Sequence, residues 1–255
     1  FIDKSNYDHL GIEPSKNVFE VSKNKKLNVI NEFFTNELSL NLSKYKKKTD
    51  VIYAANVICH IPDLNNLFQG IENLLSKKGL FIFEEPYLGD VIRLTSYDQI
   101  YDEHVYLFSL LSVDKIAKLF DLEIIDAYPQ TTHGGSMRYV VARKGEYAIS
   151  DNFKKLLLKE LEQGLDKFET YLKFKEDCEI SKQRLIQILS SLKNQEKKVS
   201  GYAATSKSTT ILNYCKIGKD LINCIYDTTP IKINKFSPGM HIPIKHHKDF
   251  AKEKP

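Results

Sequence analysis

The order of apolar patterns between residues 49 and 87 limits the possible folds more than any other feature of the chain. Residues 49–60 contain the continuous apolar run that is typical of a buried parallel strand. Pro62 and Asp63 suit the start of a helix, apolar residues follow at helical spacing, and residues 77–79 suit its end. Residues 79–87 then repeat a strand pattern. This order predicts a right-handed βαβ unit and therefore an α/β fold with a parallel sheet.

Segments on both sides of this unit fit the same class. Upstream, we expect the segment 7–15 to contain a short strand that ends in Glu13. A short strand at 19–21 and a helix up to residue 34 should follow. Downstream, we expect a capped helix at 112–120, strands at 122–127 and 139–142 paired antiparallel around a turn at 131–138, and a charged helical region at 151–198 with a second helix at 181–192.

A second α/β unit begins at residue 198. A strand, a loop of small residues and a helix at 211–216 precede a strand at 221–227 that ends in an acid. Such a loop directs backbone N–H groups toward an anion at the helix N-terminus, and Lys207, Ser208 and Thr209 would add donors. The loop matches neither the Walker A pattern nor G-x-G-x-x-G. It is therefore a candidate phosphate site without a specific motif.

The stretch Tyr101-Asp102-Glu103-His104 carries the groups from which we expect catalysis. It follows the 79–87 strand after one polar connection, and side chains just past a strand's carboxyl end face the ligand crevice of an α/β fold. The imidazole can accept a proton near neutral pH, and Glu103 beside it can fix its tautomer. On spacing alone, a loop histidine with only a structural role fits equally well.

Composition argues against several other classes of function. The net charge of +4 is modest, and the lysines are scattered or in short runs, which is typical of a solvated surface and not of a nucleic-acid site. No apolar run reaches the length of a membrane span. The four cysteines form no C-x-x-C pair, so we expect neither a zinc knuckle nor a disulfide framework, and a reducing, cytoplasmic setting.

Short motifs run in a fixed order through nearly the whole chain, at residues 11–15, 56–63, 83–87, 100–109, 132–138, 201–209, 212–215 and 238–244. Together they resemble the S-adenosylmethionine (SAM)-dependent C-methyltransferases of deoxysugar biosynthesis. The resemblance implies a Rossmann-like class I methyltransferase domain over residues 1–150, a helical connector over 151–197 and the start of a Rossmann-like C-terminal domain over 198–255.

Parts of the family's pattern have no counterpart in this sequence. These are the N-terminal zinc module with paired cysteines, the glycine-rich first loop and the last strands and helices of the C-terminal domain. Ala203 and Ala204 also stand where glycine is common. We therefore expect the chain to be a piece that lacks both ends, and the activity of the piece itself is open.

The resemblance implies methyl transfer from SAM to a carbon, typically C-3, of a nucleotide-linked (dTDP or similar) 4-keto-6-deoxysugar. His104 would remove the proton beside the ketone, and the resulting enolate would attack the sulfonium methyl group. Tyr101 and Glu103 would position this base or bind the sugar, and a phenol such as Tyr101 can donate to the enolate oxygen. Because the sulfonium is already an activated electrophile, the reaction needs no metal, and we expect none.

The other predicted site residues lie at strand ends and turns. For the cofactor, Glu13 would bind the ribose hydroxyls, and Pro14, Ala55, Asn56 and His60 would contribute. For the substrate, we expect Tyr87, His133, Gly135, Ser136, Lys207, Ser208, Thr209 and His241. A surface acid at Glu13, a helix-entry role for His60 and a plain hairpin turn at 131–138 are the alternatives. We expect a monomer that binds a nucleotide sugar and neither nucleic acid nor membrane.

Three other functions stay open. A NAD-dependent nucleotide-sugar oxidoreductase is the first, and the Tyr-x-x-x-Lys pair common in such reductases occurs only as Tyr171–Lys175, on the charged helical region. A non-catalytic nucleotide-sugar binding module is the second, although it would not need an intact 101–104 stretch. An O-methyltransferase is the third; it would use the same base, so only the product separates it from a C-methyltransferase.

Overall fold

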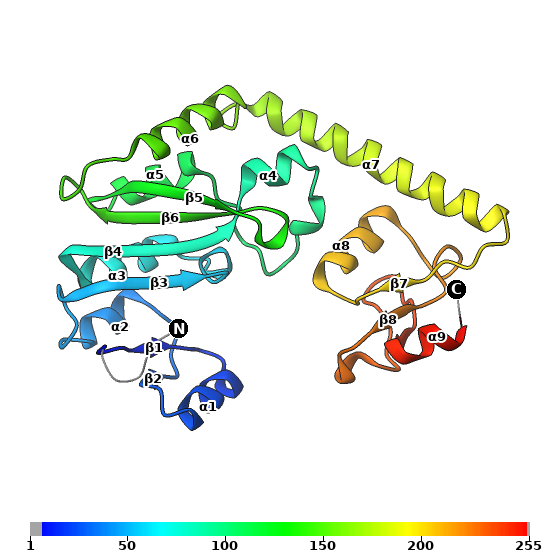
Figure 1. Ribbon diagram of the computed structural model, residues 1–255, viewed down its shortest axis with the longest axis horizontal. Coiled ribbons are helices and arrows are strands. Elements are labelled where there is room, and N and C mark those ends of the chain that lie inside the picture. The colour runs from blue at the N-terminus through cyan, green and yellow to red at the C-terminus, as the bar shows by residue number, and fades with distance from the viewer. Residues whose placement is uncertain (1–6, 254–255) are drawn as a thin grey trace.

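The computed structural model describes residues 7–253, which form two lobes spanned by one long helix, α7 (Phe168–Asn194) (Figure 1). The first lobe contains the strands up to β6, and the second contains the strands from β7 onward. Each lobe has its own cluster of buried apolar side chains. The predicted α/β class is confirmed.

The main sheet of the first lobe has the strand order β3 (Thr49–Ala55), β4 (Leu75–Pro86), β6 (Ser136–Arg143), β5 (Leu122–Gln130). Strands β3 and β4 are parallel and are joined through α3 (Leu64–Leu74), which confirms the βαβ unit. Strands β5 and β6 pair antiparallel with each other, as predicted, and β6 also pairs antiparallel with β4. The sheet therefore mixes both directions.

Helix α3 begins as its sequence predicts and ends earlier. The Asp63 carboxylate accepts the backbone N–H of Asn66 at 2.9 Å, so Asp63 is the N-cap. The helix stops at Leu74, so residues 77–79 belong to β4 and the predicted helix end is wrong. Gly79 instead allows close strand approach, because a Cβ there would lie 2.5 Å from the carbonyl oxygen of Thr49.

Strand β3 is less buried than its apolar sequence predicts. It lies at the edge of the four-stranded sheet, and the side chains of Val51 and Tyr53 are 56% and 51% exposed. An apolar run reports strand propensity, but burial depends on what covers each face.

The N-terminal segment forms a separate two-stranded parallel sheet of β1 (Gly11–Ile12) and β2 (Val29–Ile30). The predicted strand that ends in Glu13 is confirmed. The predicted strand at 19–21 is wrong, because these residues lie in α1 (Lys16–Asn24) and the strand follows the helix. Apolar alternation over three residues is too short to distinguish a strand from a helix. Helix α2 (Asn36–Asn41) leads from β2 toward β3.

Three helices complete the first lobe: α4 (Leu88–Arg93), α5 (Leu110–Lys118) and α6 (Asp151–Glu162). The cap of α5 is Ser109, in a reciprocal capping box with Ser112, so this helix begins before the predicted residue 112. Strand β6 already begins at Ser136, inside the predicted turn. The 27 residues of α7 form one continuous helix where a separate second helix was predicted at 181–192.

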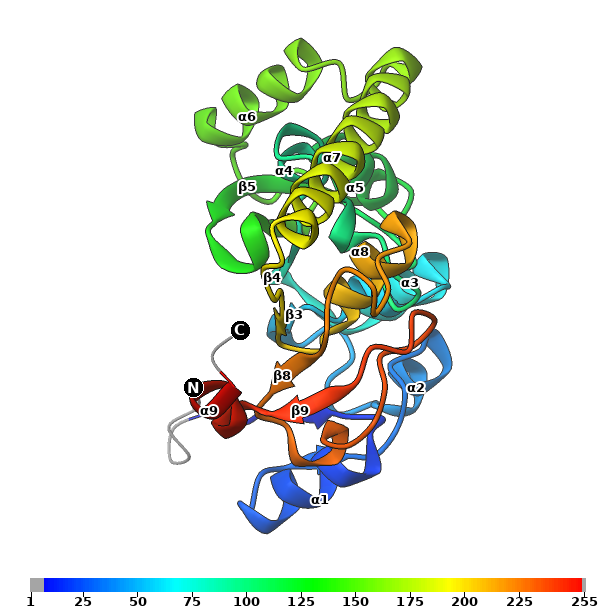
Figure 2. The same cartoon turned by 90° about the vertical axis from the view of Figure 1, so that its right-hand side faces the viewer.

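The second lobe contains a parallel sheet of β7 (Gly201–Tyr202), β8 (Ile225–Asp227) and β9 (Ile244–His246), with β8 in the middle. Figure 1 shows β7 beside β8, and Figure 2 shows β8 beside β9. Helix α8 (Ser206–Cys215) connects β7 and β8, and α9 (Phe250–Glu253) follows β9. The predicted strand–loop–helix–strand order is confirmed. Helix α8 begins before residue 211, and β9 was not predicted.

A 3₁₀ turn of the first lobe, η2 (Tyr97–Gln99), is packed into the core of the second. The Tyr97 hydroxyl lies 3.5 Å from Sγ of Cys215, and its ring lies 5.2 Å from that of Tyr214. The stretch that follows η2, residues 100–104, is thereby held between the two lobes.

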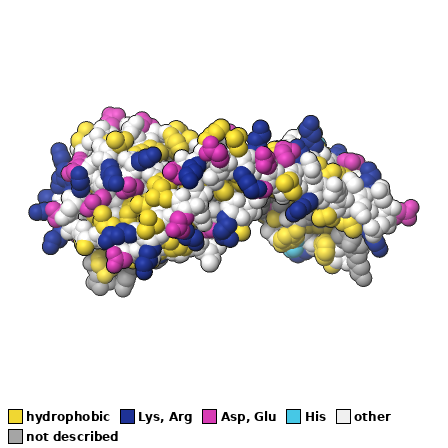
Figure 3. Space-filling model, turned by 90° about the horizontal axis from the view of Figure 1, so that it is seen from above, with side chains coloured by type: hydrophobic (Ala, Val, Ile, Leu, Met, Phe, Trp, Pro, Cys, Tyr) yellow, Lys and Arg dark blue, Asp and Glu magenta, His cyan; other side chains and the backbone are white. Residues whose placement is uncertain are grey.

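Charged side chains of both signs are interspersed with apolar ones over both lobes on the face shown in Figure 3. Among residues 7–253, no helix combines the length and apolar character that crossing a bilayer requires.

Candidate active site

A cleft with a volume of about 740 Å³ lies between the lobes. The first lobe lines it with Ile100, Tyr101, Asp102 and Glu103, and the second lobe with the first turns of α8 and with residues 231–238. This volume is typical of a small-molecule site. Of the predicted site residues, Tyr101, Glu103, Ser208 and Thr209 line this cleft, while the expected base His104 lies beside Tyr101 and does not itself line it.

His104 has the protonation state that a base requires. Its Nδ1 lies 2.8 Å from the carbonyl oxygen of Gln99 and must donate to it, so Nε2 carries the lone pair. Burial lowers the pKa of the half-buried imidazole; the hydrogen bond to Gln99 opposes this, and the neighbouring His60 and Lys207 add to it. His104 is therefore neutral near pH 7. The Gln99 carbonyl, not the Glu103 carboxylate as expected, fixes the tautomer.

Tyr101 lies directly beside this imidazole. The two ring centroids are 4.1 Å apart at an interplanar angle of 33°. Burial raises the pKa of the Tyr101 phenol, and the charge of Glu103 adds to this effect. The phenol thus keeps its proton near neutral pH and can donate a hydrogen bond.

His60 approaches His104 from the 3₁₀ turn η1 (Ile58–His60), which follows β3. Its Nδ1 donates to the carbonyl oxygen of Glu103 at 2.6 Å, and its ring lies 5.3 Å from that of His104. The Val105 N–H donates to the carbonyl of Cys59 at 2.9 Å. These two hydrogen bonds thus tie the turn after β3 to the 101–105 segment.

Glu85 is a buried carboxylate behind this turn that the sequence analysis did not single out. Its Oε1 accepts the N–H groups of Val57 at 2.9 Å and Ile58 at 2.6 Å. Burial raises its pKa, although these hydrogen bonds oppose the rise. An acid inside the apolar strand pattern 79–87 was the available signal. Glu85 fixes the position of η1 and so of His60.

The predicted cofactor residues lie at the ends of two strands. Glu13 follows β1, and one of its carboxylate oxygens accepts the N–H of Ser15 at 2.7 Å. Asn31 fixes the backbone there by donating to the carbonyls of Glu13 and Pro14 at 2.8 and 2.9 Å. Within residues 7–253 the second carboxylate oxygen has no hydrogen bond, so it suits the hydroxyls of a ribose.

At the end of β3, Ala55 is the last strand residue and Asn56 adopts a left-handed backbone with φ of 53°. The Asn56 N–H donates to the carbonyl of Glu84 at 2.8 Å. Asparagine tolerates this conformation better than most residues. Its side chain is exposed at the strand end.

Among the predicted substrate residues only Ser208 and Thr209 line the cleft, and three of the others have structural contacts inside the first lobe. Tyr87 packs against the first-lobe core, and burial raises the pKa of its phenol, which lies beside the Glu160 carboxylate. Ser136 is fully buried, and its hydroxyl donates to the carbonyl of Thr132 at 3.1 Å. Gly135 has a φ of 131° and lies against Asp90. These contacts are structural.

His133 and Lys207 meet across the interface between the lobes. The carbonyl of His133, whose φ is 55°, accepts from Nε2 of Gln99 at 2.5 Å and lies 3.5 Å from Nζ of Lys207. Lys207 is close enough to His104 to lower its pKa. His241 is exposed in a turn of the second lobe and does not line the cleft.

The small-residue loop before α8 is already partly occupied by the protein itself. The Ala204 N–H donates to Oδ2 of Asp227 at 2.7 Å. Burial raises the pKa of Asp227, but hydrogen bonds from Thr229 and Ala204 outweigh this effect and lower it to about 2. The Ser208 hydroxyl accepts the N–H of Thr205 at 2.9 Å. An anion at this helix start would therefore meet fewer free donors than the sequence suggests.

The Tyr-x-x-x-Lys pair expected of a reductase lies away from the cleft. Tyr171 and Lys175 are on α7, and the Tyr171 hydroxyl donates to the carbonyl of Leu165 at 2.7 Å. The pair therefore provides no support for the oxidoreductase alternative.

Comparison with known proteins divides the chain near residue 130, so β6 and α6 of the first lobe fall within the second of two matches. Residues 1–127 match the model of a methyltransferase domain, and residues 131–255 match that of the C-methyltransferase C-terminal domain. C-methyltransferase NovU from Streptomyces niveus is 28% identical over 236 residues, which cover 92% of this chain and 56% of NovU. The chain thus spans little more than half the length of this curated relative.

Two solved structures show lower similarity. PH0226 protein from Pyrococcus horikoshii OT3 is 18% identical with a TM-score of 0.42, over 55% of this chain and 73% of that one. An S-adenosylmethionine-dependent methyltransferase from Clostridium acetobutylicum ATCC 824 is 16% identical with a TM-score of 0.42, over 55% of this chain and 76% of that one. The two domain matches confirm the predicted methyltransferase fold followed by a C-methyltransferase C-terminal domain.

Proposed function

We propose that this chain transfers the methyl group of SAM to C-3, the carbon beside the ketone, of a nucleotide-linked 4-keto-6-deoxysugar. The chain belongs to the C-methyltransferase family, whose two domains it carries. The observation that carries the proposal is the tautomer and protonation of the His104 imidazole. A half-buried imidazole whose Nδ1 proton is held by Gln99 offers Nε2 as a proton acceptor at neutral pH.

Proton removal is the step for which these side chains are suited. Nε2 of His104 takes the proton from the carbon beside the ketone, and the electrons move onto the ketone oxygen as an enolate. The Tyr101 phenol donates to that oxygen, which stabilises its developing charge. When bound, SAM supplies a methyl group on an activated sulfonium centre. Glu13 would hold its ribose hydroxyls, with Asn56 at the neighbouring strand end.

The cleft between the lobes suits the nucleotide-sugar end of the substrate. Its volume of about 740 Å³ fits such a ligand, and Lys235 adds a cation to its lining. The diphosphate would lie near Ser208, Thr209 and Lys207, where a helix N-terminus and a lysine favour negative charge.

The test uses the full natural protein that contains these residues, with SAM and a dTDP-4-keto-6-deoxyhexose, in deuterated water. We expect a mass gain of one methylene on the sugar, and deuterium exchange at the carbon beside the ketone when SAM is omitted. His104→Ala should slow both by about 10²- to 10⁴-fold, the usual contribution of a general base. His246→Ala, which changes a histidine at the end of β9 in the second lobe, should leave both unchanged.

Each alternative gives a different result. Methyl transfer that survives His104→Ala would contradict the role of this base. Methylation on oxygen without deuterium exchange would indicate an O-methyltransferase. A folded chain that binds the sugar nucleotide and neither exchanges nor methylates it would favour the binding-module alternative.

A further inference from the structure

Three side chains, one of them the proposed base His104, form a cluster whose capacity to bind a metal ion is not needed for methyl transfer. One ligating atom each of Cys59, His60 and His104 lies within 4.8 Å of the other two. Cys59 and His60 come from η1, and His104 comes from the stretch after η2. No C-x-x-C or H-x-x-x-H spacing predicts this cluster, because its residues come together only in the folded chain.

Both imidazoles are oriented as metal-binding histidines usually are. His60 donates Nδ1–H to the carbonyl of Glu103 at 2.6 Å, and His104 donates Nδ1–H to that of Gln99 at 2.8 Å. Metal-ligating histidines typically hold their second nitrogen in this way, which fixes the ring and leaves the lone pair on the other nitrogen. Here two neighbouring rings, with centroids 5.3 Å apart, show the same arrangement.

The backbone also holds the two segments in register before any ion binds. The N–H groups of Val105 and Tyr106 both donate to the carbonyl of Cys59, at 2.9 and 3.3 Å. Glu85 accepts the N–H of Ile58, the residue before Cys59. A site supported by such contacts loses little conformational entropy when it takes up an ion.

We propose that Cys59, His60 and His104 form a binding site for a divalent cation such as Zn²⁺. A bound cation takes up the lone pair of His104, the proposed base. One thiolate and two imidazoles are ligands that Zn²⁺ and Co²⁺ prefer in tetrahedral geometry, and three protein ligands leave a fourth position for water. A second cavity of about 390 Å³, lined by His60, Asp102, Glu103 and Val105, opens the His60 side of the cluster to solvent, while Cys59 is buried on the other side. Burial and the neighbouring Glu85 carboxylate raise the pKa of the Cys59 thiol, so metal binding has to displace its proton. On binding, the Cys59 S–H bond breaks, an S–metal bond forms and the proton passes through the Glu85 carboxylate to water.

The consequence for the proposed reaction is reversible inhibition. A metal bound to the lone pair of His104 prevents this nitrogen from accepting a proton. This inference rests on the proposed function only for that consequence, because binding itself can be measured without any methyl transfer.

The test is titration of the chelator-treated 255-residue chain with Co²⁺, followed by absorption spectroscopy. We expect one equivalent to give intense visible bands of four-coordinate cobalt and a near-ultraviolet sulfur-to-cobalt charge-transfer band, both lost on addition of Zn²⁺. Cys59→Ser should abolish the charge-transfer band, and the buried-cysteine control Cys224→Ser should retain it. His60→Ala, at an exposed position, should weaken binding by more than about 100-fold, since even supporting residues of metal sites contribute 10- to 100-fold.

The outcomes separate this inference from the proposed function. A wild-type chain without the charge-transfer band, or with the same affinity as His60→Ala, would overturn the metal site whatever its activity. In the methylation assay, Zn²⁺ should inhibit wild type at concentrations at least about tenfold below those that inhibit His60→Ala. Equal inhibition would overturn the blocking of the base.

Discussion

The carbonyl oxygen of Gln99 lies 2.8 Å from Nδ1 of His104, and the side chain of the same Gln99 donates to the carbonyl of His133 at 2.5 Å. One almost fully buried residue thereby orients the proposed base and holds the 132–134 turn beside it. Because the carbonyl belongs to η2, which is packed into the second lobe, the orientation of His104 depends on both lobes.

Two charges of opposite sign act on His104, so substitutions should move its pKa in opposite directions. The Lys207 cation disfavours the imidazolium and lowers the pKa of His104, whereas Glu103 raises it. Lys207→Met should therefore raise this pKa and Glu103→Gln should lower it. NMR titration of the His104 ring proton measures both, and the acid limb of kcat/KM should follow. The His246 resonance serves as the control; shifts of the same sign in both variants would contradict this electrostatic account.

Glu160 should stabilise the packing of α6 on α5. Its carboxylate is fully buried and accepts the N–H groups of Leu110 and Leu111 at 2.6 and 2.9 Å. Glu160→Ala leaves both donors without a partner, so we expect the free energy of unfolding to fall by about 2–4 kcal/mol. Urea denaturation measures this loss. Glu162→Ala, at an exposed position on the same helix, should change it by less than about 0.5 kcal/mol.

The same residue makes a pH-dependent contribution with a defined sign. Burial raises the pKa of Glu160 above its ordinary value of 4.5, so folding takes up a proton. Its contribution to stability is greatest below the unfolded pKa and declines as pH rises through the folded pKa. Glu160→Gln removes this decline, so the stability difference between wild type and variant should change with pH above 4.5. A stability difference between wild type and Glu160→Gln that stays constant with pH would contradict a raised pKa for Glu160.

Much of the fold could be predicted because its signals are local. Asp63 at the start of α3 and the strand–helix–strand order around it are set by neighbouring residues. The exposure of β3 and the full length of α7 could not be predicted, since they depend on what the rest of the chain covers. Some boundaries differed even where the cap is local, since the capping boxes of Ser109 and Thr205 begin α5 and α8 before the predicted residues.

The candidate site divides in the same way. The stretch from Tyr101 to His104 was identified because its chemistry is contiguous. Glu85 was missed because it acts on Ile58, 27 residues earlier, and Glu160 because it acts on Leu110, 50 residues earlier. Hydrogen bonds from a buried carboxylate to distant backbone leave no spacing in the sequence, apart from an acid inside an otherwise apolar element.

Two adjacent glycines should respond differently to alanine. Gly134 and Gly135 have φ values of 84° and 131°, so alanine is strained at both, by about 1–2 kcal/mol. A Cβ at Gly134 meets open space, whereas one at Gly135 would overlap the Asp90 carboxylate. We expect Gly135→Ala to lower the free energy of unfolding by about 1–3 kcal/mol more than Gly134→Ala, from the added overlap. Adding Asp90→Ala to Gly135→Ala should restore part of the lost free energy of unfolding, because the overlapping carboxylate is gone. Equal losses in the two single glycine variants would contradict the overlap.

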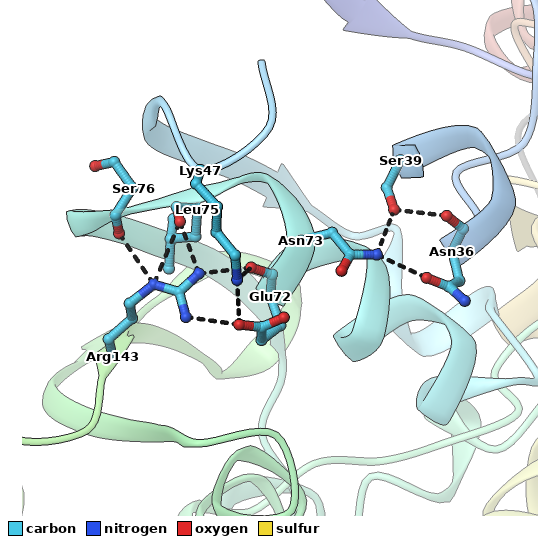
Figure 4. Close-up of polar contacts among 8 residues, drawn as sticks. All are labelled: Asn36, Ser39, Lys47, Glu72, Asn73, Leu75, Ser76 and Arg143. Carbon is cyan, nitrogen blue, oxygen red and sulfur yellow. Dashed lines mark hydrogen bonds and ion pairs between the residues drawn. The ribbon is translucent and has the colours of Figure 1, made fainter. Parts of the chain in front are cut away.

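Arg143 should be an anchor between β6 and the end of α3 that lysine cannot replace. Its guanidinium donates to the Glu72 carboxylate at 2.7 Å and to the carbonyls of Glu72 and Leu75 at 2.6 and 2.7 Å (Figure 4). A lysine ammonium cannot present this planar set of donors, so Arg143→Lys should lower the free energy of unfolding by about 1–3 kcal/mol. Arg184→Lys, an exposed arginine on α7, is the control.

The pH dependence of this anchor has the opposite sign to that of Glu160. Burial alone would raise the pKa of Glu72, but Lys47 and Arg143 outweigh burial and lower it below 4.5. The ion pair therefore contributes fully above the unfolded pKa and is lost as pH falls through the folded pKa. Urea denaturation at a series of pH values should show the gap between wild type and Arg143→Met narrowing as the solution becomes more acidic. A gap that stays constant into acid would mean that Arg143 acts through its carbonyl contacts alone.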